Sequence, residues 1–516
     1  MPSLRIHETQ NPLLYEINAR VWLGEMQPLA KGKSRRPPPG ARRGGLAQVP
    51  AGAVNEIAGL GFDLVWLMGV WQTGAAGERL ARELIERHPE MSRALDGFDP
   101  LEDVVSSPYA VQDYTAAESL GGPKGLAGFR GALAKKGIGL LLDFVPNHTA
   151  RDHAWVRAHP EYYLHGTEDD QQDDPTGYFV AETARGRRLL AHGRDPHFPG
   201  WSDTAQLNYR HPGARAALIE TLLGIAGQCD GVRCDMAMLV LEEVFDRTWG
   251  ERAQTADGPA AEGEFWAEAI DAVRARHPDF LFLAEAYWGL EGRLQALGFD
   301  YAYDKTLYDR LLHQGAGPVH GHLCAEADFQ ARSARFLENH DEPRTAEVFP
   351  FEQHRAAALL TFTLPGMRFF HEGQLEGRRF RVPVQLRRRP KEAPQAEVRQ
   401  FYESLLGELG QPALGNGKWK LLHPRPAWEG NASFQQVLAH RWEHRVGSRV
   451  VAVNYAPQQA QCYVPLHLHG VAGRKLRLRD VFSGDVLDRN GDELLNPGLY
   501  LDLAPYQIHL FSVQRA

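Results

Sequence analysis

The sequence predicts an α/β fold: a (β/α)8 barrel with a small domain inserted after the third strand and an antiparallel β-sandwich at the C-terminus. Three observations indicate it. Short apolar runs alternate with helical patterns between residues 13 and 371. The alternation lapses once, in a polar stretch rich in Gly, Pro and Asp. After about residue 424, short alternating runs follow one another without helices, which is typical of antiparallel sheets.

The predicted strands of the barrel are residues 13–22, 63–70, 137–145, 231–237, 280–287, 299–303, 334–341 and 367–371. Helical spacing occurs at residues 54–60, 78–88, 123–136, 213–228, 261–276 and 352–362. Eight strands alternating with helices are the number for a closed barrel. A doubly wound open sheet is the alternative, but the sequence lacks the Gly-rich phosphate-binding turn that follows its first strand.

The domain boundaries follow from these changes of pattern. Residues 1–148 and 209–424 are assigned to the barrel, which would carry catalysis. Residues 149–208 are too long for a plain strand-to-helix loop and are therefore predicted to form an inserted domain. Residues 425–516 are predicted to form the β-sandwich, with strands at 434–441, 449–455, 462–466, 476–481 and 508–513.

Composition limits the classes of function. The chain of 516 residues has a formal charge of −8, which argues against a nucleic-acid surface and favours a neutral small molecule or oligosaccharide as partner. No run of about 18 apolar residues predicts a membrane span, and residues 1–12 lack an apolar signal region, so we expect a cytoplasmic protein. The four cysteines show no zinc or redox spacing. The oligomeric state is not predicted.

Charged side chains gather where predicted strands end. Arg233 and Asp235 lie two residues apart in an apolar strand and therefore project from the same face. Alone, they would be read equally well as a salt bridge in the core of the sheet. Other strand ends carry Asp143, Asn147, His148, Glu285, His340 and Asp341. Because barrel active sites lie at the C-terminal ends of the strands, these residues indicate one site.

Two kinds of chemistry use such a set. Glycoside hydrolysis needs one carboxylate as nucleophile or base and one carboxylic acid that protonates the leaving oxygen. Burial and a nearby like charge raise the pKa of one partner, so that the two take different roles. The alternative is a divalent metal site in a lyase or isomerase, but Arg233 beside Asp235 would compete with the cation.

Four stretches carry a family resemblance: Asp-Phe-Val-Pro-Asn-His at 143–148, Gly-Val-Arg-Cys-Asp at 231–235, Ala-Glu at 284–285 and Asn-His-Asp at 339–341. In order and spacing they resemble the signature regions of the α-amylase family of retaining glycosidases and transglycosidases. The resemblance implies that Asp235 is the nucleophile, Glu285 the general acid/base, and Asp341 the carboxylate that binds sugar hydroxyls.

The resemblance also implies substrate contacts. His148, Arg233 and His340 would contact the sugar in the −1 subsite, and Tyr109 would stack under it. Asp143 is included with these residues as an anchor for the mouth of the barrel.

The regions around residues 147–155 and 339–344 are more similar to oligo-1,6-glucosidases and trehalose synthases than to classical endo-amylases, which implies that Arg344 also reaches the substrate. Ser106 replaces the aspartate with which exo-glucosidases hold a terminal sugar, so exo-specificity is not implied.

The expected function is cleavage of α-glycosidic bonds in α-glucans, maltooligosaccharides or a related disaccharide through a covalent glycosyl-Asp235 intermediate. The same site would serve a transglycosylase or a trehalose-type isomerase. A non-catalytic carbohydrate-binding scaffold is a further alternative, although such proteins usually lose a carboxylate and this chain keeps Asp235, Glu285 and Asp341. No cofactor is expected; a structural calcium bound partly by Asn147 is the alternative.

Two basic segments lie outside these patterns. Residues 31–45 contain four arginines and a Pro-Pro-Pro run, and residues 378–391 contain six arginines and one lysine. Both are expected to be solvated loops. The alternatives are a basic docking patch for the first and acceptor or phosphate binding for the second.

Overall fold

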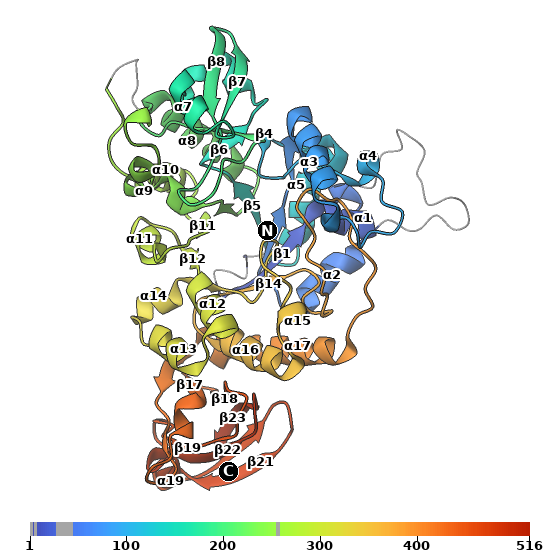
Figure 1. Ribbon diagram of the computed structural model, residues 1–516. Coiled ribbons are helices and arrows are strands. Elements are labelled where there is room, and N and C mark those ends of the chain that lie inside the picture. Colours follow the sequence, from blue (N-terminus) through green and yellow to red (C-terminus); the bar gives the residue numbers. More distant parts are fainter. Residues whose placement is uncertain (1–3, 5–7, 27–44, 254–258, 516) are drawn as a thin grey trace, which may run out of the picture.

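Parallel strands close into a barrel in the computed structural model, which describes residues 4, 8–26, 45–253 and 259–515 (Figure 1). The eight strands are β1 (Leu13–Asn18), β2 (Leu64–Met68), β5 (Gly139–Phe144), β10 (Gly231–Cys234), β11 (Leu281–Ala284), β12 (Tyr301–Tyr303), β13 (Ser333–Arg335) and β14 (Met367–His371). Each falls within a predicted strand or begins one residue before it. The barrel prediction is confirmed, and β1 closes it by pairing with both β2 and β14.

Two barrel strands end four or more residues earlier than predicted. The first was expected to reach residue 22, but the Asn18 side chain accepts hydrogen bonds from the main-chain N–H groups of Arg20 and Val21 and so begins α1 (Ala19–Glu25). The seventh ends at Arg335, so that His340 and Asp341 lie on the loop beyond β13. This loop brings polar side chains over the mouth without placing them in the sheet.

Helices cover the outside of the barrel. Those predicted are α2 (Ala51–Gly59), α3 (Ala75–Arg87), α5 (Gly122–Ala134), α8 (Pro212–Ala226), α10 (Phe265–Arg274) and α16 (Phe351–Thr363). Further helices are α4 (Pro100–Asp103), α9 (Glu242–Trp249), α11 (Glu291–Ala296), α12 (Lys305–His313), α13 (Ala316–Leu323), α14 (Ala327–Ala331), α15 (Thr345–Val348), α17 (Ala396–Leu409) and α18 (Pro412–Asn416). Their apolar faces pack on the strands, as α10 does with Phe265, Trp266 and Ile270.

The segment after β5 forms a separate group of small elements at one end of the molecule (Figure 1). It contains α6 (Ala154–Ala158), α7 (Glu168–Asp173) and the hairpin of β7 (Tyr178–Thr183) and β8 (Gly186–Ala191). β6 (His148–Ala150) pairs with β9 (Thr204–Gln206) where the segment leaves and rejoins the barrel. A second antiparallel pair, β3 (Trp71–Thr73) and β4 (Val111–Ala116), follows β2.

The C-terminal region lies at the opposite end of the molecule from this segment (Figure 1). A six-stranded antiparallel sheet contains β15 (Lys418–Leu422), β17 (Val437–His444), β18 (Gly447–Asn454), β23 (Ile508–Arg515), β20 (Lys475–Asp480) and β21 (Val486–Asn490). A three-stranded sheet contains β16 (Arg425–Pro426), β19 (Ala460–Val464) and β22 (Leu499–Leu503), and α19 (Gly491–Leu495) follows β21. The two sheets share a hydrophobic core, which confirms the antiparallel C-terminal domain.

The expectation of a solvated loop at residues 378–391 is only partly right, because Arg379, Arg381 and Lys391 are exposed but other arginines pair with carboxylates of the chain. Arg389 is buried and donates to Glu25 at 2.7 Å and to Glu372 at 2.5 Å. Arg388 binds both carboxylate oxygens of Asp103 at 2.7 Å. The segment is therefore held against the barrel by the acidic residues of the chain itself. The other basic segment lies outside the described residues except for Gly45.

Within the described part of the chain, no helix combines the length and the apolar character that crossing a bilayer requires.

Candidate active site

The site is built around the guanidinium of Arg233, which is fully buried on β10. Its NH1 lies 2.6 Å from Asp235 Oδ1, and its NH2 lies 2.8 Å from Glu285 Oε2. Three aromatic rings surround the cation, those of Trp66, Tyr109 and Tyr303, with centroids at 5.0, 5.3 and 5.7 Å. One cation thus connects two of the three predicted catalytic carboxylates.

Glu285 follows β11 and is held by two further donors. The main-chain N–H of Met236 donates to Oε2 at 2.6 Å, and the Tyr287 hydroxyl donates to Oε1 at 2.7 Å. Burial raises the pKa of Glu285 to about 7 against the opposing charge of Arg233, with Asp235 and Asp341 adding to the rise. The side chain is therefore protonated below neutral pH, which suits a general acid.

Asp235 lies directly after β10, at the start of a tight turn. Met236, the next residue, has a left-handed backbone with φ of 42°, and this turn directs its N–H toward Glu285. Burial raises the pKa of Asp235, while Arg233 opposes the rise through its charge and its hydrogen bond. Arg233 therefore favours the ionised form that a nucleophile requires.

Asp341 faces solvent with 48% of its side chain exposed, in contact with His340. Its Oδ2 lies 2.9 Å from His340 Nε2. Partial burial works against ionisation, but the charge and hydrogen bond of His340 outweigh it and lower the pKa of Asp341 to about 2. The Arg381 guanidinium donates to the main-chain oxygen of Asp341 at 2.5 Å. Asp341 is thus ionised and accessible at the mouth.

Tyr109 and His148 line the same region. The Tyr109 ring stacks on the imidazole of His340 with centroids 5.3 Å apart, and its hydroxyl lies 2.7 Å from His340 Nε2. Burial lowers the pKa of His148 to about 4, partly offset by the main chain of Tyr109, so the ring is neutral. Gly193 from the inserted segment packs on this ring, because a Cβ there would lie 2.9 Å from it.

Asp143 and Arg344 hold the surroundings of the cluster. Both Asp143 oxygens accept hydrogen bonds at 3.1 Å, one from the Trp66 indole and one from the Gly69 main chain, which is an anchoring role. Arg344 is buried and donates to Glu338 at 2.5 Å and to His371 Nδ1 at 2.9 Å. Its expected contact with substrate stays a prediction.

Exposed aromatic side chains follow Glu285 in the chain and meet the inserted segment. Trp288, three residues after Glu285, has a left-handed backbone with φ of 64° and is 41% exposed. His197 of the inserted segment packs edge-on against it at 5.0 Å. Phe198, the next residue, is also exposed. Such rings are the usual platform for sugar faces.

The calcium alternative does not fit the residues present. The Asn147 side-chain oxygen accepts a hydrogen bond from the Gln206 amide at 3.0 Å, and its main-chain oxygen accepts another at 2.9 Å. Both Asn147 oxygens thus accept a hydrogen bond from Gln206. Within the described ranges, no group of three or more Asp, Glu, His and Cys side chains has a metal-binding arrangement.

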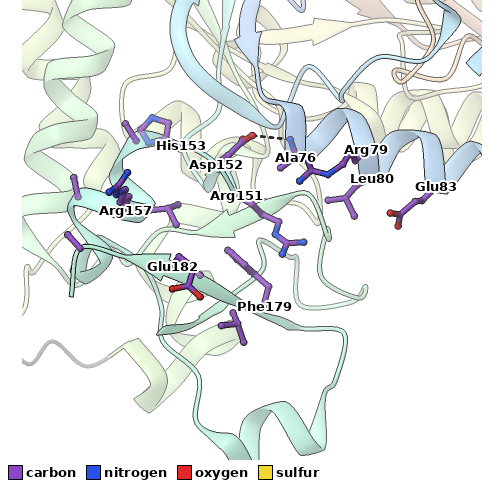
Figure 2. A pocket seen from close by; sticks show the side chains of 16 residues that line it. Ala76, Arg79, Leu80, Glu83, Arg151, Asp152, His153, Arg157, Phe179 and Glu182 are labelled. Atoms are coloured by element: carbon purple, nitrogen blue, oxygen red, sulfur yellow. Dashed lines mark hydrogen bonds between the residues drawn. The ribbon is translucent and has the colours of Figure 1, made fainter. Parts of the chain in front are cut away.

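A separate cavity of about 710 Å³ lies between α3, residues 151–158 and β7. Figure 2 shows Arg79 and Arg151 projecting toward its centre and Asp152 bonded to Ala76. Its lining includes none of Asp235, Glu285 and Asp341, so this cavity is distinct from the site around Arg233.

Some residues of the site were not predicted. Glu16 on β1, Tyr287 and Tyr303 contact His340, Glu285 and Arg233 respectively. Only Glu16 leaves a signal in the sequence, as a carboxylate within an apolar strand. The tyrosines look like ordinary aromatic residues of strands and loops.

Comparisons with known proteins show which family the chain resembles. Residues 54–305 match the family described as alpha amylase, catalytic domain. The alpha-amylase MalA of Haloarcula japonica is 28% identical over 388 residues, which cover 72% of this chain and 45% of that protein. The 1,4-alpha-glucan branching enzyme GlgB of Bordetella bronchiseptica is 27% identical over 49% of this chain and 34% of its own length. The chain thus spans less than half the length of these curated relatives.

Solved structures share the fold over nearly the whole chain. The noncanonic maltogenic alpha-amylase AmyB of Thermotoga neapolitana has a TM-score of 0.66 at 18% identity, with 98% of each chain covered. An alpha-amylase of Lactobacillus plantarum has a TM-score of 0.65 at 19% identity, covering 98% of this chain and 99% of its own.

Proposed function

We propose that this chain, of which residues 54–305 match the alpha-amylase catalytic domain, is a glycoside hydrolase or transglycosylase that cleaves α-glycosidic bonds of α-glucans, maltooligosaccharides or a related disaccharide with retention of configuration. The proposed reaction is a double displacement. Asp235 is the nucleophile, Glu285 the general acid and then base, and Asp341 the carboxylate that binds sugar hydroxyls.

In the first step, an Asp235 oxygen attacks the anomeric carbon as the bond to the leaving oxygen breaks. Glu285 gives its proton to that oxygen, so a neutral sugar leaves and a glycosyl ester remains on Asp235. In the second step, Glu285, now ionised, accepts a proton from water or from a sugar hydroxyl. The resulting oxygen bonds to the anomeric carbon and the ester bond to Asp235 breaks.

The observation that carries the proposal is the sharing of Arg233 between Asp235 and Glu285. Carboxyl groups bound at 2.6 and 2.8 Å to two nitrogens of one guanidinium lie close together. The shared cation places the proposed nucleophile and the proposed acid in one site, as a double displacement requires. The roles then follow from the pKa of about 7 at Glu285 and the direct hydrogen bond that favours ionisation at Asp235.

A trapping experiment tests the nucleophile. A 5-fluoro-α-glucosyl fluoride slows both steps, so a retaining enzyme accumulates a covalent glycosyl ester. We expect peptide mapping by mass spectrometry to place the label on Asp235. A label on another residue would mean that this residue, and not Asp235, is the nucleophile. A product with inverted anomeric configuration, measured by NMR, would refute the double displacement.

Transglycosylation is the second candidate, favoured by the exposed pair of Trp288 and His197 beside Glu285. Transfer requires an acceptor sugar that reaches the glycosyl ester before water does, and a stacking platform would hold it there. Relatives named as a branching enzyme and as a maltosyltransferase are consistent with this candidate.

A product panel distinguishes the two candidates. Maltose, trehalose, sucrose, isomaltose and maltooligosaccharides would be incubated with and without an acceptor sugar. If transfer dominates, Trp288→Ala should lower the ratio of transfer to hydrolysis severalfold. Trp428→Ala is the matched control, because Trp428 is 53% exposed on the C-terminal region. An unchanged ratio in Trp288→Ala would remove the platform from the proposal.

A further inference from the structure

A buried line of ionisable side chains runs behind the mouth of the barrel. It connects Arg344, Glu338 and His371 with Glu16, His340 and Asp341. These groups come from β1, from β14 and from the loop after β13. Only Asp341 at its end is substantially exposed, so the other five groups form an internal network that the double displacement does not use.

The geometry around His340 favours its protonated form. Nδ1 lies 2.6 Å from Glu16 Oε1, and Nε2 lies 2.9 Å from Asp341 Oδ2. An ionised carboxylate only accepts hydrogen bonds, so two flanking carboxylates favour a proton on each ring nitrogen. The Tyr109 hydroxyl lies 2.7 Å from Nε2 and accepts from it when that nitrogen is protonated.

Other groups that face His340 are an indole and a distant carboxylate. Trp66 packs edge-on against the ring at 5.5 Å, and Asp143 interacts with its charge. Glu16 is therefore the only buried carboxylate in hydrogen-bond contact with His340 among the described residues, since Asp341 faces solvent.

The second carboxylate oxygen of Glu16 faces His371 without forming a hydrogen bond. Glu16 Oε2 is buried and has no hydrogen-bond partner within the described chain. His371 Nδ1 accepts from Arg344 at 2.9 Å, so the His371 proton lies on Nε2, which faces Glu16 Oε2 at 4.0 Å. His371 in turn lies beside Glu338, which Arg344 and the Thr345 main chain bind. Arg344, Glu338 and His371 thus fix the position of the Glu16 carboxylate on the side away from His340.

We propose that Glu16 is a positioning residue for catalysis, which keeps His340 doubly protonated and directs its Nε2–H toward Asp341 and the bound sugar. The inference rests on the proposed function, because it assigns to Glu16 the task of ordering the carboxylate that binds sugar hydroxyls. It also gives Arg344 a role as the anchor of the line. Burial disfavours the charged ring, but Asp341 and Glu16 together raise the pKa of His340 well above its ordinary value.

The test is the pH dependence of kcat/KM for Glu16→Gln. The substitution keeps the shape of the side chain and removes its charge. Loss of a buried charged hydrogen bond should lower the pKa of His340 by about one to two units, which is a tenfold to hundredfold loss of imidazolium at each pH above it. Relative to wild type, kcat/KM on maltotetraose should fall by no more than about threefold at pH 5.5, and above the lowered pKa of His340 the loss should grow about tenfold per pH unit.

Asp304→Asn is the matched control. Asp304 is equally buried and pairs with His322 at 2.8 Å and with Arg335 at 3.2 Å, away from His340. We expect this variant to lose stability while the shape of its pH profile is unchanged. A Glu16→Gln profile that is merely scaled down at every pH would overturn the proposal, because a structural defect alone gives that result.

A direct measurement covers the case in which Glu16→Gln does not fold. Histidine labelled with ¹⁵N reports whether one or both ring nitrogens carry a proton, and His340→Gln assigns the signals. In wild type, His340 should remain doubly protonated to pH 8; a neutral ring at pH 7 would overturn the proposal. This readout needs no turnover, so failure of the proposed function, seen as no activity on any α-glucan, is distinguished from failure of the Glu16 assignment.

Discussion

Replacement of Glu285 by glutamine tests the role of Glu285 as general acid/base, because it removes the acidic proton of this side chain and changes little else. The pKa of about 7 means that about 90% of Glu285 is protonated at pH 6, whereas an ordinary glutamate with a pKa of 4.5 would be about 3% protonated. Burial therefore increases the acid form about thirtyfold at this pH. For an acid that must be protonated, activity is full below the raised pKa and is lost as pH rises through about 7.

The assay compares two leaving groups. The leaving group of a maltooligosaccharide is a sugar alkoxide, which leaves poorly without a proton. On this substrate, Glu285→Gln should therefore lower kcat/KM by a factor of about 10²–10⁴. A dinitrophenyl α-maltoside needs no proton to leave, so formation of the glycosyl ester should be nearly unaffected. Azide attacks that ester without base catalysis and should restore turnover. The basic limb near pH 7 should be absent for this substrate.

Glu291→Gln is the control for this experiment, because Glu291 is a buried glutamate on the helix after the Glu285 loop. This variant should keep the loss of kcat/KM above about pH 7. It should also keep the wild-type ratio of kcat/KM between the two substrates. Equal losses of Glu285→Gln on both substrates, with no response to azide, would refute the role of Glu285 as the acid/base.

Asp235→Asn should reduce kcat by several orders of magnitude with an unchanged circular dichroism spectrum; full activity on maltooligosaccharides and trehalose would contradict the nucleophile. Arg389→Ala should lower the free energy of unfolding by about 3–5 kcal/mol in urea titrations, because it leaves Glu372 unpaired in a buried place. Exposed Arg379→Ala should change it by less than about 0.5 kcal/mol, and equal effects would contradict the buried pair. Activity should survive EDTA, because the described residues hold no group of three or more Asp, Glu, His and Cys side chains arranged for a metal ion, and loss of activity restored by calcium would refute this.

Most of the barrel was predictable, because continuous apolar strands and intervening helices are local patterns. The ends of the strands were less so. Asn18 caps a helix that cuts the first strand short, and the sequence Tyr-Glu-Ile-Asn reads equally well as a strand that continues. Four C-terminal strands, β15, β16, β21 and β22, were missed, and β21 and β16 expose most of their side chains, so neither shows a clear apolar alternation.

The three carboxylates were found because they lie in short motifs whose order is informative. The residues that tune them were not, since they are distant in sequence. Glu16 and His340 are 324 positions apart, and only the closed barrel brings them together. The basic segment at 378–391 was misread in part for the same reason: its charge suggests solvent, while its partners Glu25 and Asp103 come from the other end of the chain.

The pairing of the first and last strands has a consequence for biosynthesis. β1 lies in register with β14, with Glu16 opposite His371, and this seam closes the barrel. A nascent chain that has not yet released β14 already contains Asp235, Glu285 and Asp341, but its two edges remain apart. Turnover should therefore appear only when the seam closes. The recovery of activity during refolding then reports when β1 pairs with β14.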